Sequence, residues 1–329
     1  MDDTGGGDDG PPPPMDSGMS HGDLSLGCKA PAPAGAQLAA APKPYAGTCP
    51  TLAPMTTIDA VITSSGNQRK FWVVVPEDMQ PDEKLPVIFL WHWLGADAQD
   101  FVERGNVQTA VNKQRFLAVV PQAKGDLQFT WPATALESAA RLEEDAVFFD
   151  DMLSCVSQQF NVDSNCVSSA GVSAGALWTA QLVGVRGDWI ASFMSLSGGT
   201  GGTAIKPWKA PAHKMPAFVL WGGSTDTCGG VLNFGAISQN LEMGLTTGNH
   251  FLVECIHNCG HSVPPFEAGM GATAFESLWQ FGLDHPFWLY PGESKYKQSG
   301  MPADLPPWCG IGMGGAMQRT GMCIDESQC

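Results

Sequence analysis

The feature that most constrains this chain is an alternation of short apolar strands with amphipathic helices, which runs from Thr56 to Tyr290. LPVIFLW and FLAVVP are continuous apolar runs, whereas EEDAVFFDDMLSCVSQQF places apolar and charged residues at helical spacing. Apolar strands that alternate with helices are typical of a mainly parallel sheet with helices on both faces. We therefore predict one α/β domain over residues 56–290.

Two flanking segments lack this pattern. Residues 1–55 are acidic and rich in Gly and Pro, which predicts a tether that Cys28 and Cys49 can pin to the domain. Residues 291–329 contain three cysteines among Gly, Pro and Met. We expect this second segment to be an irregular extension held by disulfides.

Composition excludes some classes of partner and points to a compartment. The formal net charge is −16 and no basic cluster offsets it, which argues against nucleic acid as a partner. No run approaches the ~20 apolar residues of a membrane-spanning helix. The ten cysteines include no CxxC pair, which is typical of disulfides formed in an oxidising compartment. Because the first ten residues have neither a basic nor an apolar signal region, we expect a secreted, periplasmic or outer-surface monomer whose export signal has been removed, with a lipid anchor left open.

A candidate nucleophile, Ser173, lies in GVSAG (Gly171 to Gly175), where an apolar strand meets a helix. G-x-S-x-G at such a turn is typical of serine hydrolases with the α/β-hydrolase fold. The turn exposes the hydroxyl above the sheet, and small neighbours avoid collisions between strand and helix. The helix that follows also directs its N-terminal dipole at the serine. The alternative is an ordinary turn serine between glycines.

A serine nucleophile needs a base and an acid, and chain order in this fold is serine, acid, histidine. FVLWGGSTD leads from an apolar strand to Asp226, and FLVECIHNCGH leads from the next strand to His261. Both lie at the C-terminal ends of strands, where open α/β sheets place their sites. We therefore predict Asp226 as the acid and His261 as the base. We prefer His261 to His257 because His261 follows Gly260 in a loop.

The run of Cys255, His257, Cys259 and His261 has a zinc site as an alternative interpretation. In an extended strand these side chains would lie in a row about 7 Å apart, which is too extended for one tetrahedral ion. We therefore predict no metal. Cys228 is expected to form a disulfide with Cys255 or Cys259, which would hold the acid loop against the histidine loop.

An oxyanion hole is expected from two backbone N–H groups. One belongs to Ala174, and the other comes from the loop LWHWLGADAQDF, where Leu94 or Trp93 is the candidate. Trp93, Trp131 and His92 are candidates for substrate contact, with core packing as the alternative for the tryptophans.

Four segments make the chain similar to a known family, the secreted α/β-hydrolase esterases that include polyhydroxybutyrate depolymerases and feruloyl esterases of the carbohydrate esterase family 1 kind. They span residues 85–265 and read LPVIFLWHWLGADAQDF, EDAVFFDDMLSCVSQQFNVDSNCVSSAGVSAG, LWGGSTD and CGHSVPP. The chain departs from this family at Trp93, where glycine is usual. It also departs at Cys166, where a basic residue is more usual. We expect Cys166 to form a disulfide with Cys155.

The resemblance implies acyl transfer on carboxylic esters with no cofactor. His261 would take the Ser173 proton, an acyl-enzyme would form, and water activated by the same histidine would release the acid. The expected substrates are aromatic, feruloyl-type esters or polyesters, with a polyhydroxyalkanoate or synthetic aromatic polyester (PET-like) depolymerase as an alternative. A serine peptidase of the same fold and a non-catalytic hydrolase-fold binding protein are the further alternatives.

Overall fold

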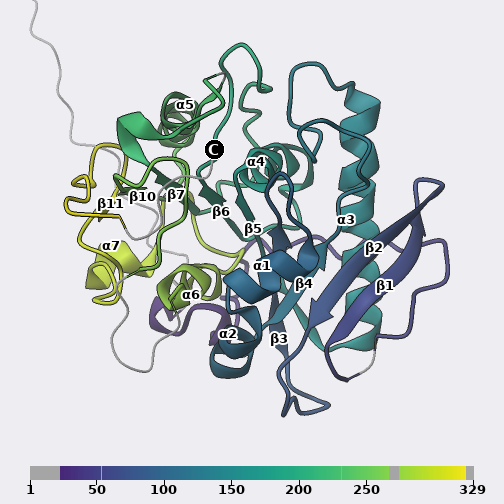
Figure 1. The fold of residues 1–329 in the computed structure, drawn as a ribbon. Coiled ribbons are helices and arrows are strands. Elements are labelled where there is room, and N and C mark those ends of the chain that lie inside the picture. Colours follow the sequence, from purple (N-terminus) through teal and green to yellow (C-terminus); the bar gives the residue numbers. More distant parts are fainter. Residues whose placement is uncertain (1–22, 53, 231, 267–273, 324–329) are drawn as a thin grey trace, which may run out of the picture.

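A computed structural model describes residues 23–52, 54–230, 232–266 and 274–323, and a nine-stranded sheet runs through them (Figure 1). In spatial order its strands are β1 (Thr57–Ser64), β2 (Asn67–Val74), β4 (Leu117–Pro121), β3 (Leu85–Trp91), β5 (Val162–Val172), β6 (Ser192–Leu196), β7 (Ala217–Trp221), β10 (Leu252–Ile256) and β11 (Cys309–Ile311). From β4 to β10 all neighbours are parallel, whereas β1, β2 and β11 pair antiparallel at the two edges. The predicted mainly parallel sheet is confirmed.

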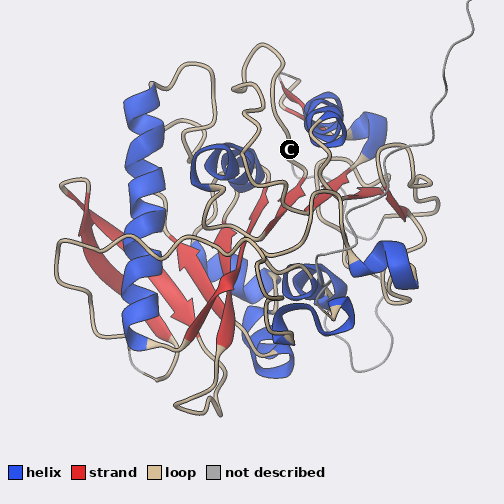
Figure 2. Cartoon of the chain, turned by 180° about the vertical axis from the view of Figure 1, so that it is seen from behind, coloured by secondary structure: helices blue, strands red, loops and turns tan. Residues whose placement is uncertain are grey.

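Helices cover both faces of the sheet, as the alternating pattern predicts (Figures 1 and 2). One face carries α1 (Ala98–Arg104), α2 (Val107–Gln114) and α6 (Glu276–Asp284), and the other carries α3 (Ala139–Gln159), α4 (Ala174–Arg186) and α5 (Phe234–Thr247). Strand side chains alternate between the two apolar cores. Phe89 packs with the α3 and α4 side, while Ile88 and Leu90 pack with the α1 and α6 side. Continuous apolar strands are explained by this burial on both faces.

Residues 98–114 form two consecutive helices, α1 and α2, and not a single one. Asn106, between α1 and α2, has a left-handed backbone with φ of 47°. A residue in that conformation ends the run of right-handed helical geometry. Asn is among the few residues that adopt it at low cost, so the break is local.

The N-terminal strap, which we define as residues 23–52, packs against the domain as an extended segment after a short 3-10 helix, η1 (Leu24–Lys29). Two disulfides attach it, Cys28–Cys166 to β5 and Cys49–Cys155 to α3. The expected pairing of Cys155 with Cys166 is therefore wrong. Cys166 shares its strand face with Ser168, which lies against the α6 backbone, whereas Cys155 is on α3 across the sheet. A disulfide cannot join side chains on opposite faces.

The C-terminal extension contributes regular structure that its composition did not predict. It contains α7 (Lys295–Ser299) and β11, which pairs with β10 at the edge of the sheet. Two disulfides, Cys255–Cys309 and Cys259–Cys323, tie it to β10 and to the loop after β10. Cys228 is also disulfide-bonded, but its expected partners Cys255 and Cys259 are taken, so that prediction is wrong. Among the described residues, no helix has the length and apolar composition needed to cross a membrane.

Candidate active site

Ser173 lies at a sharp turn between β5 and α4 that only small residues permit. Its backbone has φ of 52° and ψ of −115°, a sparsely populated conformation for a residue with a side chain. A Cβ on Gly171 would lie 2.1 Å from the Gly175 carbonyl oxygen, and a Cβ on Gly175 would lie 2.0 Å from the Trp91 carbonyl oxygen. Close backbone contact thus explains both glycines of the motif, and the turn leaves the Ser173 side chain partly exposed.

The structure brings Ser173, Asp226 and His261 into one hydrogen-bonded chain. The His261 Nδ1–H donates to Asp226 Oδ1 at 2.7 Å, and His261 Nε2 lies 2.7 Å from Ser173 Oγ. Asp226 is fully buried, and its second oxygen accepts the Gly222 N–H at 2.8 Å. Because the carboxylate holds the proton of Nδ1, the lone pair of Nε2 faces the serine hydroxyl. This arrangement can withdraw a proton from Ser173.

Phe234, at the start of α5, is a neighbour of the site that the sequence analysis missed. Its ring centroid is 3.9 Å from that of His261, and its backbone N–H donates to the Asp226 carbonyl oxygen at 2.8 Å. The phenyl ring covers one face of the imidazole and excludes water there. The sequence signal was a Phe at a helix start, which occurs in many settings.

His257, the alternative candidate for the base, does not reach Ser173 and has a different hydrogen-bond partner. It is fully buried, and its Nδ1 accepts the Cys259 backbone N–H at 3.1 Å. Burial lowers the His257 pKa to about 4, so the ring is neutral at pH 7. The disulfides of Cys255 and Cys259 also leave no thiolate for the alternative zinc site. Within the described ranges, no group of three or more His, Cys, Asp or Glu side chains is arranged to hold a metal ion.

Two of the residues expected to contact substrate are instead buried beneath the loop after β3. His92 is 1% exposed, donates from Nδ1 to the Trp93 carbonyl oxygen at 2.9 Å and accepts the Ala123 N–H at Nε2 at 3.2 Å. Trp131 is fully buried, and its indole N–H donates to the His92 carbonyl oxygen at 2.8 Å. The expectation of substrate contact is therefore corrected for both, because their side chains support the loop from inside.

The candidate oxyanion loop lies directly beside the first turn of α4. A Cβ on Gly175 would also be 2.8 Å from the His92 carbonyl oxygen. Leu94 is half exposed. The Trp93 ring packs against α1, and its centroid lies 5.9 Å from that of the Phe101 ring. Ala174 begins α4, so its N–H has no acceptor within the helix. The assignment of Ala174 with Leu94 or Trp93 as oxyanion donors stays a prediction.

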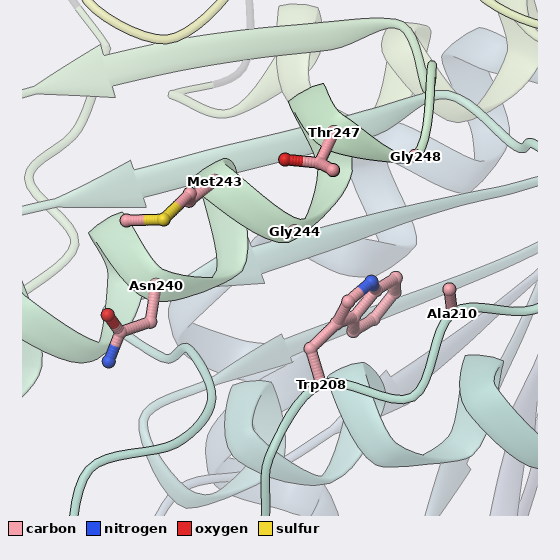
Figure 3. A pocket seen from close by; sticks show the side chains of 7 residues that line it. All are labelled: Trp208, Ala210, Asn240, Met243, Gly244, Thr247 and Gly248. Atoms are coloured by element: carbon pink, nitrogen blue, oxygen red, sulfur yellow. The ribbon is translucent and has the colours of Figure 1, made fainter.

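A separate groove of about 410 Å³ lies further along α5 (Figure 3). Its lining carries no charged side chain and consists of Trp208, Ala210, Asn240, Met243, Gly244, Thr247 and Gly248. The residues predicted for the site are all absent from this lining. Phe234, at the N-terminal end of α5, contacts His261. The groove therefore lies towards the opposite end of α5 from Ser173, Asp226 and His261.

A mainly parallel sheet with a strand–turn–helix serine and strand-end acid and histidine defines the α/β-hydrolase fold, which is the class of this protein. No protein-family model matches the chain. It is 31% identical over 171 residues to feruloyl esterase D of Neurospora crassa, and this match covers 49% of the chain and 55% of that protein. The chain thus spans about half the length of the curated relative it matches. This similarity confirms the resemblance to the feruloyl esterase group that the motifs indicate.

Solved structures support the fold. The structure of native sOPH matches with a TM-score of 0.61 and 17% identity over 82% of this chain and 97% of that one. A ferulic acid esterase matches with a TM-score of 0.51 and 14% identity over 63% of this chain and 92% of that one. At these identities the likeness concerns the fold.

Proposed function

We propose that this protein is a serine carboxylic-ester hydrolase that acts through an acyl-enzyme on Ser173. The observation that carries the proposal is the chain of two 2.7 Å contacts from Asp226 through His261 to Ser173. His261 removes the hydroxyl proton as Ser173 attacks the ester carbonyl, and it then protonates the leaving alcohol. Asp226 holds the imidazole in the required tautomer and stabilises the imidazolium. Water activated by His261 then releases the carboxylic acid.

The developing oxyanion is assigned to the backbone N–H of Ala174 and to one from Leu94 or Trp93. The contact of Gly175 with the backbone of Trp91 and His92 supports this, because it sets the oxyanion loop against the first turn of α4. Preorganised donors of this kind stabilise the transition state without reorganisation during the reaction.

The proposed substrates are aromatic, feruloyl-type esters, with polyesters as the second candidate. The similarity to feruloyl esterase D supports the first class. We place the protein outside the cytoplasm, because four disulfides join cysteines of the described residues and such bonds persist in oxidising compartments.

Labelling with a fluorophosphonate probe tests the mechanism. We expect stoichiometric labelling of the wild type and none of Ser173→Ala, with circular dichroism as the control for folding. Absence of labelling in a folded wild type would refute the serine hydrolase.

A substrate panel then separates the candidate classes. Methyl ferulate, a polyhydroxybutyrate film, a synthetic aromatic polyester film and a peptide p-nitroanilide are compared under the same conditions. We expect the largest kcat/KM on methyl ferulate. Preference for the anilide would instead identify a peptidase.

A further inference from the structure

The histidine loop, residues 257–262, carries His261 but has no helix or strand of its own. Its inner side contacts the residues that directly follow β6 and β7. Ser197 Oγ donates to the Ser262 carbonyl oxygen at 3.0 Å, and a Cβ on Gly222 would lie 1.9 Å from the Gly260 carbonyl oxygen. Gly260, directly before His261, has a left-handed φ of 65°. A glycine in this position gives the loop little stiffness of its own.

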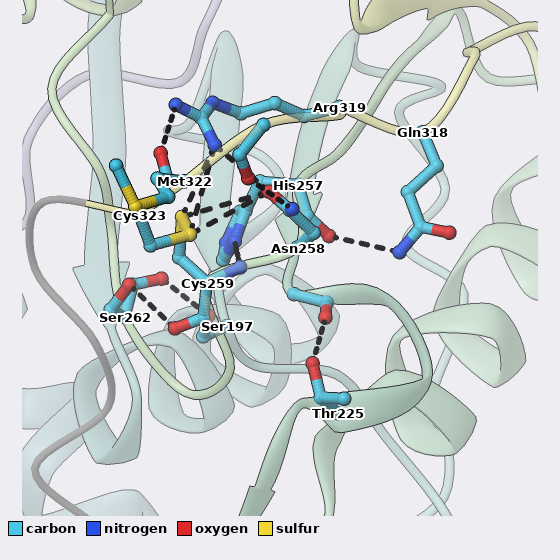
Figure 4. The surroundings of a disulfide bond; sticks show 12 residues. Ser197, Thr225, His257, Asn258, Cys259, Ser262, Gln318, Arg319, Met322 and Cys323 are labelled. Atoms are coloured by element: carbon cyan, nitrogen blue, oxygen red, sulfur yellow. Dashed lines mark hydrogen bonds between the residues drawn. A yellow bond between two sulfur atoms is a disulfide. The ribbon is translucent and has the colours of Figure 1, made fainter.

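The outer side of the loop is covered by the C-terminal clamp, which we define as residues 309–323 (Figure 4). Its first residues form β11, and residues 319–321 then hydrogen-bond to the end of β10 and to the histidine loop. The Arg319 backbone N–H donates to the Ile256 carbonyl oxygen at 2.8 Å, and Arg319 Nη1 donates to Asn258 Oδ1 at 2.9 Å. Asn258 Nδ2 in turn donates to the Gly321 carbonyl oxygen at 2.8 Å. Asn258 is thus hydrogen-bonded through both ends of its amide to the clamp.

A covalent bond completes this attachment. The Cys259–Cys323 disulfide joins the clamp to the loop two residues before His261, and Cys259 is 2% exposed. Arg319 Nη2 donates to the Met322 carbonyl oxygen at 3.1 Å, so the same guanidinium also fixes the turn that presents Cys323. The contacts of the clamp with the loop therefore fall immediately before His261.

A small displacement of His261 is enough to break the site, because its two ring nitrogens must hydrogen-bond to Asp226 and Ser173 at the same time. A displacement of about 1 Å in a catalytic group costs on the order of 10²-fold in rate. We propose that the C-terminal clamp positions His261 for its reaction with Ser173 through Arg319 and the Cys259–Cys323 disulfide. This inference rests on the proposed hydrolase function. The clamp touches no reacting atom, so Arg319 and Cys323 are positioning residues, and activity depends on the oxidised state of one disulfide.

The double variant Cys259→Ser/Cys323→Ser tests the covalent part. We expect kcat for a p-nitrophenyl ester to fall at least tenfold while KM changes less than threefold. The fluorophosphonate should still label one serine per chain, but at a rate reduced by a similar factor. The matched control is Cys49→Ser/Cys155→Ser, which removes a disulfide of the N-terminal strap and should label at the wild-type rate.

Arg319 gives a test that leaves the disulfide intact. We expect Arg319→Ala to lower kcat by about a factor of ten, and Arg319→Lys, which keeps one donor near Asn258, to recover part of that loss. An unchanged labelling rate in both sets of variants overturns the inference. Fewer labelled chains at an unchanged rate would show a purely structural role and overturn it as well. Failure of the wild type to label would instead refute the proposed hydrolase itself.

Discussion

Gly175 illustrates how strictly single residues are fixed at the serine turn, because its Cα faces the Trp91 carbonyl oxygen with no space for a methyl group. We expect Gly175→Ala to lower the free energy of unfolding by about 3 kcal/mol, the upper end of overpacking costs. Urea denaturation measures the loss. Gly66→Ala is the control, since its Cβ would meet open space and only its φ of 76° is unfavourable, which should cost about 1 kcal/mol. Equal losses in the two variants would contradict the steric explanation.

Asp226 can be tested by an isosteric change. In Asp226→Asn the amide favours the wrong imidazole tautomer, so His261 Nε2 no longer accepts the Ser173 proton. We expect kcat to fall by about 10⁴-fold with little change in KM. Steady-state kinetics on a p-nitrophenyl ester measure this, with the unfolding midpoint as the control. A loss of less than tenfold would show that Asp226 is not the acid.

Because of Glu242 on α5, we expect the free energy of unfolding to depend on pH. It is fully buried, accepts the Trp221 indole N–H at 2.9 Å and lies near Glu254. Burial, reinforced by the Glu254 carboxylate, raises the Glu242 pKa to about 9. The folded state therefore keeps a proton that the unfolded state loses above pH 4.5, and the contribution of this group to stability falls as pH rises towards 9.

Replacing Glu242 with Gln removes that dependence. Between pH 6 and 8 we expect the wild type to lose about 3 kcal/mol of stability relative to Glu242→Gln, because one proton is worth ~1.4 kcal/mol per pH unit. Urea titrations at the two pH values give the difference. A constant difference across the range would mean that Glu242 is ionised in the folded protein.

Sequence patterns predicted which three side chains come together better than they predicted the surroundings of those side chains. The strand–helix junction and chain order located Ser173, Asp226 and His261, which the structure brings together. Burial was harder to predict, because Trp131 and His92 belong to loops whose packing depends on distant strands. A tryptophan that supports a loop and one that lines a cleft have the same local sequence pattern.

At the scale of elements, the N-terminal strap should contribute stability through its disulfides. Cys28 and Cys166 are 138 residues apart, so their bond greatly restricts the unfolded chain. We expect Cys28→Ser/Cys166→Ser to lower the free energy of unfolding by up to about 5 kcal/mol in the chain-entropy account. Urea denaturation without reductant measures it. A loss below about 1 kcal/mol would show that the strap contributes little.

Elements that follow one periodic pattern were predicted from the sequence, and pairings over long distances were not. The strands of the central sheet and the helices α3 and α4 follow from apolar spacing, which is a local signal. The break at Asn106 depends on one dihedral angle, and β11 exists because β10 offers it a free edge. The cysteine partners depend on which face of the sheet each side chain occupies, which only the assembled layers determine.

At the scale of the whole molecule, buried histidines should make the protein sensitive to acid. Burial lowers the pKa of His213, His257 and His285 to about 4 each. The unfolded chain takes up their protons from about pH 6.5 downwards, so stability is lost as pH falls from 6.5 towards 4.

The expected size of this effect follows from proton counting. At pH 6.5 these histidines are only half protonated in the unfolded chain, so each contributes a loss of about 1.6 kcal/mol between pH 6.5 and 5. Glu242 opposes them with a gain of about 2 kcal/mol, which leaves a net loss of about 3 kcal/mol. Urea midpoints across this range measure it. A midpoint that stays constant would mean that the histidines are charged in the folded state.

The attachment of the N-terminal strap also sets an order of events during synthesis. Cys28 precedes its partner by 138 residues and Cys49 precedes its partner by 106. At roughly 5–20 residues per second, each waits on the order of ten seconds before the other cysteine exists. The earliest described part of the chain thus cannot become fixed until about half of the chain has been made. Until Cys155 and Cys166 have been made, Cys28 and Cys49 lack their partners, so a bond formed early between the two would have to be broken by disulfide exchange before the strap could attach.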